Sequence, residues 1–376
     1  MTNPDITRMR RSALMAVVSR DRRRLAAMFG FILFLHLLGF GLMLLVARGG
    51  PVNAAHGFGV GVGLTAYVLG MRHAFDADHI VAIDNTTRKL LGEGRRPVSV
   101  GFWFSLGHST VVLLLCLALG LGVRAIAGGV VDESSSLHQA TGIWGSLVSG
   151  LFLLLIGILN ARAFAGIFKV ARRARNGDYD SDELDHQLRS RGFLARILGK
   201  LTKSVRKEWH MHPIGLLFGL GFDTATEISL LILSSSAAAF DLPWYAYLAL
   251  PFLFAAGMSL LDTIDGTVMM AAYEWALLSP ARRIYYNLVI TGISVATALI
   301  VGGVGLGRLL GEQLGVTSGP LAWAGQIDFE YVGYGIVALF LTTWIVSAAV
   351  WRFGRIEERL QPRHVTSKPA RAVAGS

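Results

Sequence analysis

Residues 72–80 read RHAFDADHI, which places two imidazoles, two carboxylates and a guanidinium within a long, mostly apolar run. Charged side chains are costly at membrane depth and normally face a bundle interior or line a path. On a helix with about 100° per residue, His73, Asp76 and His79 share one face, whereas Asp78 does not. We therefore expect either that Asp78 contacts a different helix or that this helix is locally unwound, as in transporters whose backbone lines a cavity.

Three more polar clusters lie inside apolar runs. They read FSLGHSTVV at 104–112, LGFDTATEI at 220–228 and GMSLLDTIDG at 257–266. Together with the first stretch they supply imidazole and carboxylate groups that we predict to be metal ligands, namely His73, Asp76, Asp78, His79, His108, Asp223, Glu227, Asp262 and Asp265. Nearby side chains with a predicted accessory role are His36, Arg72, Phe75, Ser109 and Thr226.

The donor types limit the metals that such a set binds. Imidazoles with carboxylates and no thiolates suit borderline divalent transition metals, whereas carboxylates alone would suit Mg(II) or Ca(II). The only cysteine is Cys116, so a thiolate cluster, a CxxC motif and a disulfide framework are excluded. The acidic groups at depth outnumber Arg72, the one basic residue inside a span. Buried carboxylates without partners need a cation or protons, and a passing divalent metal supplies the charge.

A structural interpretation is the alternative. Polar side chains often cross-link transmembrane helices by hydrogen bonds, and small residues let helices approach closely. Gly107 directly before His108 and Gly257 directly before Met258 predict such close approach. Four clusters with three histidines and six acids favour a metal path over simple cross-linking.

The composition indicates a polytopic membrane protein. The chain has 376 residues, of which 53% are hydrophobic and 16% charged, and its mean hydropathy is +0.52. A soluble protein carries about 25% charged residues. Apolar runs of about twenty residues read as transmembrane helices. We predict an all-α fold with eight of them, at about 26–47, 57–83, 99–123, 142–161, 213–236, 245–272, 285–306 and 331–351.

The basic residues orient these spans. With the N-terminus inside, the inner segments hold 31 Lys and Arg residues and the outer connections three. The positive-inside rule then places both termini in the cytoplasm, and predicts a multi-pass protein of the cytoplasmic (inner) membrane. The predicted parts are a basic tail (1–25), a membrane transport domain (26–351) with a cytoplasmic loop (162–212), and a C-terminal tail (352–376). The net charge of +10 follows from this rule, so the lipid bilayer, and no nucleic acid, is the expected partner.

The four motifs, in order on spans two, three, five and six, resemble those of the nickel/cobalt transporter (NiCoT) family of secondary permeases. The family's His–x4–Asp–His core is matched by His73, Asp78 and His79. The resemblance covers about residues 26–351 and implies uptake of Ni(II), Co(II) or both across the cytoplasmic membrane. It implies that these three residues are essential and that the other motif acids and His108 lie on the pathway. His36 together with Phe75 resembles the type that accepts cobalt as well as nickel.

The chain carries no GxxxxGK[ST] motif, so no ATP hydrolysis is built in. Two charges crossing about 100 mV gain roughly 4–5 kcal/mol, which is enough to draw a divalent ion inward. We expect no permanently bound cofactor, only the transported ion. A metal exporter would carry the same ligands and remains the first alternative. A membrane metalloenzyme is the second, and it is disfavoured because the chain has no HExxH and few histidines, so we predict no enzyme activity.

Overall fold

The computed structural model describes residues 19–48, 60–120, 135–175, 205–221, 230–231, 233, 244–276, 280–327 and 329–353. Within these residues all regular structure is helical and no strand occurs, in agreement with the predicted all-α class. In chain order the elements are α2 (Arg22–Arg48), α4 (Val60–His73), α5 (Ala77–Gly92), α6 (Val100–Gly120), α8 (Ser136–Arg175), η1 (Glu208–His210), α12 (Met211–Gly219), α14 (Trp244–Ala276), α15 (Pro280–Leu314), α16 (Pro320–Gly325) and α17 (Phe329–Phe353).

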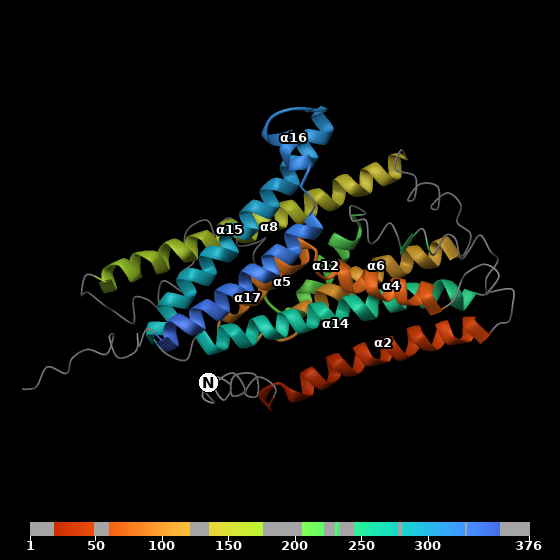
Figure 1. The fold of residues 1–376 in the computed structure, drawn as a ribbon, viewed down its shortest axis with the longest axis horizontal. Coiled ribbons are helices and arrows are strands. Elements are labelled where there is room, and N and C mark those ends of the chain that lie inside the picture. The colour runs from red at the N-terminus through yellow and green to blue at the C-terminus, as the bar shows by residue number, and fades with distance from the viewer. Residues whose placement is uncertain are drawn as a thin grey trace, which may run out of the picture.

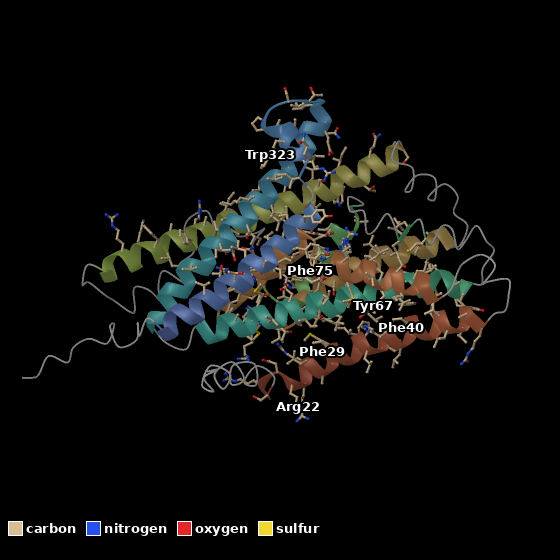
Figure 2. All side chains as sticks on the ribbon, in the orientation of Figure 1. Arg22, Phe29, Phe40, Tyr67, Phe75 and Trp323 are labelled. Atoms are coloured by element: carbon tan, nitrogen blue, oxygen red, sulfur yellow. The ribbon has the colours of Figure 1, made fainter. Side chains whose placement is uncertain are left out.

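The long helices form a bundle in which α14 is central (Figure 1). One side of α14 packs against α2 and α4, and another packs against α6. In the view of Figure 1, α2 forms one edge of the bundle and α8, which packs on α15, lies toward the other. The short helix α16 stands away from the bundle, and Figure 2 shows Trp323 at this projection. The centre of the bundle therefore lies where α14 meets α4, α5 and α6.

Five of the described helices are long and apolar enough to cross a membrane. They cover Arg22–Arg48, Val100–Ala118, Gln139–Gly166, Leu248–Tyr273 and Thr291–Leu314. These five correspond to predicted spans one, three, four, six and seven. The apolar stretch Tyr331–Phe340 falls within predicted span eight but is shorter. Apolar side chains such as Leu37 and Ile300 are more than half exposed on the outside of the bundle, which suits contact with lipid.

Predicted span two is two helices rather than one. Helix α4 ends at His73, residues 74–76 are turn and extended chain, and α5 begins at Ala77. Asp76 is the N-cap residue of α5 and has extended backbone angles. The second of the two expectations for this stretch, local unwinding, is therefore correct. The unwound segment is covered by α17, because a Cβ at Gly333 would clash with the backbone carbonyl of Phe75.

Two helices depart from the predicted spans. Helix α8 continues 14 residues past the predicted end of span four at residue 161, into the segment predicted as a cytoplasmic loop. Its extension, RAFAGIFKVARRAR, is rich in Ala and Arg, which are strong helix formers, so the helix continues although the apolar run has ended. Predicted span five, 213–236, is described only in part, by α12 and by residues 230–231 and 233.

Glycines fix the position of α6 between its neighbours. A Cβ at Gly101 would clash with the backbone carbonyl of Asp262 in α14, and one at Gly107 would clash with the carbonyl of His212 in α12. The close approach predicted at Gly107 is therefore present, and Gly257 makes the corresponding contact with the carbonyl of Tyr67 in α4. These contacts bring α4, α6 and α14 close enough for their polar side chains to meet.

Candidate metal centre

Three histidines from three helices meet at the broken span. His73 is the last residue of α4, His79 lies in the first turn of α5, and His108 lies in the middle of α6. The ring centroids are 4.6 Å apart for His73 and His79, 4.8 Å for His73 and His108, and 4.9 Å for His79 and His108. One ligand nitrogen from each ring lies within 4.8 Å of those of the other two, and all three rings are buried. The arrangement brings together three nitrogen donors suited to one metal ion.

In two of these rings, Nδ1 lies close to a carboxylate. Nδ1 of His73 is 2.8 Å from Asp76 Oδ2, and Nδ1 of His79 is 3.4 Å from Asp262 Oδ2. A carboxylate attracts the ring proton to Nδ1, which leaves the lone pair on Nε2 available to a metal. Nε2 of His79 is buried and has no hydrogen-bond partner within the described residues. Asp262 thus favours the tautomer of His79 that leaves Nε2 as the donor, whereas Asp76 lies close to Nδ1 of His73 but its Oδ2 forms no hydrogen bond within the described residues.

The spacing of the donors fits a transition metal. Nε2 of His73 and Nε2 of His108 are 3.0 Å apart. Two nitrogens bound at about 2.1 Å and at 90° to each other would be separated by about 3.0 Å, as octahedral or square-planar coordination requires. Without metal, a proton shared between the two nitrogens accounts for the same distance, and metal binding must displace it.

The break in the helix adds backbone charge to the site. Helix α4 ends at His73, so its C-terminal carbonyl groups carry partial negative charge toward the break, which favours a cation. The N-terminus of α5 carries the opposite partial charge. Asp76 at the N-cap and Asp78 in the first turn offset it. Asp76 makes no capping hydrogen bond, since its carboxylate lies against His73 instead.

The site is apolar on two sides and acidic on a third. The ring of Phe254 lies 5.5 Å from His73, and the ring of Phe104 packs edge-on to His79 at 4.8 Å. Asp262 is 1% exposed, and its Oδ1 has no hydrogen-bond partner among the described residues. The same holds for Oδ2 of Asp265, one helical turn further along α14. Within the described part of the chain neither acid pairs with Lys or Arg, so a divalent cation would balance the charge of these acids when they are ionised.

Comparison with known proteins decides the family. Residues 59–350 match the family model NicO, described as high-affinity nickel-transport protein. This match covers more than half of the chain, and the resemblance predicted from the four motifs is confirmed. The chain belongs to the NicO family.

Relatives of this NicO-family chain are similar over nearly their whole length. Nickel transporter NicT of Mycobacterium tuberculosis is 54% identical over 96% of this chain and 98% of its own. Nickel transporter NixA of Staphylococcus aureus is 44% identical over 92% and 99%, respectively. Cobalt transport protein NhlF of Rhodococcus rhodochrous is 42% identical over 86% and 91%. No solved structure matches the chain.

The structure of the NicO-family chain places most of the predicted ligands around the three histidines. Asp76 and Asp262 contact the histidine rings, as described above. Asp78 is half-buried, and its carboxylate accepts a hydrogen bond of 2.9 Å from the backbone N–H of His79. Asp223, Glu227 and the accessory Thr226 lie outside the described residues.

The predicted accessory residues differ in burial and in their distance from the histidines. Ser109 is buried next to His108, and its hydroxyl has no hydrogen-bond partner in the described residues. Arg72 is exposed. Phe75 lies in the break, near the middle of the bundle in Figure 2, and its ring is tilted by 32° against that of Tyr334 of α17, with the centroids 5.2 Å apart.

His36 stands apart from the three-histidine group. Its Nδ1 lies 2.7 Å from the carbonyl oxygen of Ile32, and its Nε2 lies 3.2 Å from the hydroxyl of Tyr67. His36 therefore links α2 to α4, with both ring nitrogens occupied by the protein. In this structure it is a contact between helices and not a member of the donor set.

One polar group near the site was not among the predicted ligands. Asp84 of α5 is fully buried and receives hydrogen bonds from Tyr273 of α14 and Ser294 of α15. The sequence carries one signal of it, because Arg88 follows Asp84 at the i,i+4 spacing of helical ion pairs. Nothing in the sequence connects Asp84 with Tyr273 or Ser294, which are 189 and 210 positions away.

Proposed function

We propose that this chain is a single-chain secondary permease that takes up Ni(II), and also Co(II), across the cytoplasmic membrane. The observation that carries this proposal is the group of His73, His79 and His108, buried at a helix break in an apolar bundle. Imidazole donors favour Ni(II) and Co(II) over Mg(II) and Ca(II). The names of the relatives, which include both nickel and cobalt transporters, support the same pair of substrates.

The path of the ion follows the polar side chains. A hydrated ion enters from outside, along the side of the bundle where α4 begins, and exchanges water for the three imidazoles at the break. Asp262 and Asp265, one turn apart on α14, receive it next. The protein then rocks to open this site inward, driven by the inside-negative membrane potential. Broken helices that meet near the membrane midplane are the usual binding element of secondary transporters.

The proposed orientation has eight spans and both termini in the cytoplasm. Ion pairs support one part of it. Arg96, after α5, is 2.7 Å from Asp21, before α2, and Arg24 of α2 is 3.1 Å from Glu208 of η1. The residues just before α2, just after α5 and just before α12 therefore lie together at one end of the bundle, as expected of segments that share a membrane face.

A binding measurement on purified protein tests the proposal. The experiment is equilibrium dialysis of the full chain in lipid nanodiscs against 63-Ni, with wild type, His79→Ala and His108→Ala. We expect one Ni(II) per chain in the wild type and at least a 100-fold weaker affinity in both variants. His36→Ala is the matched control, since it removes a membrane histidine outside the donor set, and it should bind nickel as the wild type does. Equal binding by all four proteins would contradict the proposed site.

A further inference from the structure

A second buried polar group lies beyond the histidines. Asp84 is 0% exposed, Tyr273 donates a hydrogen bond to its Oδ1, and Ser294 donates one to its Oδ2. Arg88 completes the group. Its guanidinium is 3.6 Å from Asp84 Oδ2, donates to the Tyr273 hydroxyl at 2.9 Å, and donates to the Ser294 hydroxyl. Three helices, α5, α14 and α15, are thus joined through one carboxylate and one guanidinium.

The position of this group is on the inward side of the donor set. Asp84 follows His79 by five residues on α5, which is about 7 to 8 Å along a helix axis. Arg88 is one turn further, four residues before the end of α5 at Gly92. The segment that follows α5 contains Arg96 and lies at the cytoplasmic face in the proposed orientation. An ion that leaves the histidines inward along α5 and α14 therefore meets Asp84 and Arg88 before it meets water.

The charges of Asp84 and Arg88 make a barrier to a metal cation while the two side chains are paired. Both oxygens of Asp84 are occupied, one of them next to a guanidinium that never loses its charge. A metal cation cannot use this carboxylate while Arg88 is in place, and the two positive charges repel each other. The side chain of Arg88 is 13% exposed, so it lies at the edge of the buried region.

We propose that Arg88 is a tethered cation that neutralises Asp84 and closes the inner end of the ion path. Inward release requires the guanidinium to leave Asp84, and the ion then passes this carboxylate in its place. This inference rests on the proposed uptake function. It adds an inner gate formed by α5, α14 and α15 to the site formed by α4, α5, α6 and α14.

A neighbouring pair provides the comparison with a purely structural contact. Asn85 is buried beside Asp84, and its side-chain oxygen accepts a hydrogen bond of 2.6 Å from Asn160 of α8. That contact joins α5 to α8 without any charge. Asn160→Ala is therefore a matched control, because it removes a buried contact of α5 and leaves the charged pair intact.

Accessibility of a single cysteine tests the gate. Thr87 is fully buried, lies next to Arg88, and its hydroxyl has no hydrogen-bond partner in the described residues, so a cysteine there removes no hydrogen bond seen among them. Thr87→Cys would be placed in a Cys116→Ala background, which has no other thiol. The full chain, in inside-out vesicles, is labelled with a membrane-impermeant maleimide. The Thr87→Cys protein is labelled without a further change, and also in combination with Arg88→Met, with Asp84→Asn plus Arg88→Met, or with Asn160→Ala.

We expect labelling at least tenfold faster in the Arg88→Met and double variants, and unchanged labelling with Asn160→Ala. Uptake should fall at least tenfold in both gate variants, while 63-Ni binding to the purified proteins stays within about threefold of wild type. The double variant leaves no unpaired buried charge, so it still tests the gate if Arg88→Met alone fails to fold. Slow labelling in a folded double variant would overturn the gate. If the wild-type chain does not bind nickel, the proposed function is refuted, whatever the labelling shows.

Discussion

At the scale of single residues, a carboxylate orients one histidine of the proposed donor set. Asp262 lies 3.4 Å from Nδ1 of His79 and is buried with it. Groups that orient a metal-binding histidine typically contribute about 10–100-fold in affinity. We expect Asp262→Asn to weaken Ni(II) binding by about that range, since an amide still fits the space but attracts the Nδ1 proton less strongly than a carboxylate does. Equilibrium binding to purified protein checks this, and unchanged affinity would contradict the orienting role.

Proton competition at the imidazoles gives a second residue-scale prediction. Histidine binds metal only in its neutral form. Uptake should therefore fall once the outside pH is low enough to protonate the imidazoles, and it should recover on return to neutral pH. Initial rates of 63-Ni uptake between pH 5 and 8, at constant membrane potential, measure it. Uptake that does not change with pH over this range would argue against histidine ligation.

At the scale of helices, close backbone contact holds the site together. Gly101 of α6 lies against the carbonyl of Asp262, with no space for a side chain, whereas a Cβ at Gly303 of α15 would have nothing within 4 Å. We expect Gly101→Val to abolish nickel binding and to lower the yield of folded protein, because α6 must move away from α14. Gly303→Ala should leave both unchanged. Both variants are compared by size-exclusion chromatography and by nickel binding. Normal nickel binding by Gly101→Val would contradict this prediction.

The sequence predicted the helices better than it predicted the site. Apolar runs located five helices that are long and apolar enough to cross a membrane, because lipid requires long apolar helices. The four motifs located His73, His79 and His108, since charged or polar groups are rare at depth. The break at residues 74–76 was predicted only as an alternative, because no Pro or Gly marks it and Asp78 off the polar face was its sole signal. The contacts of Asp84 with Tyr273 and Ser294 depend on the packing of three helices, which local pattern does not encode.

At the scale of the whole molecule, the distribution of basic residues predicts the orientation. The segments joined by Asp21–Arg96 and Arg24–Glu208 lie at one end of the bundle. We expect a reporter that fluoresces only in the cytoplasm to be active when fused after residue 376, and inactive when inserted near Gly319, in the predicted outer connection before α16. The reverse pattern would contradict the positive-inside orientation.

Metal accumulation in living cells tests uptake through the broken span most directly. Cells that express wild type, His73→Ala or Asp78→Asn, at equal membrane levels, are given nanomolar 63-Ni or 57-Co. We predict accumulation of both isotopes above the vector control in the wild type, and its loss in both variants, which places import at the broken span. Accumulation at or below the vector level in the wild type would contradict uptake, and a fall below that level would indicate export through the same ligands.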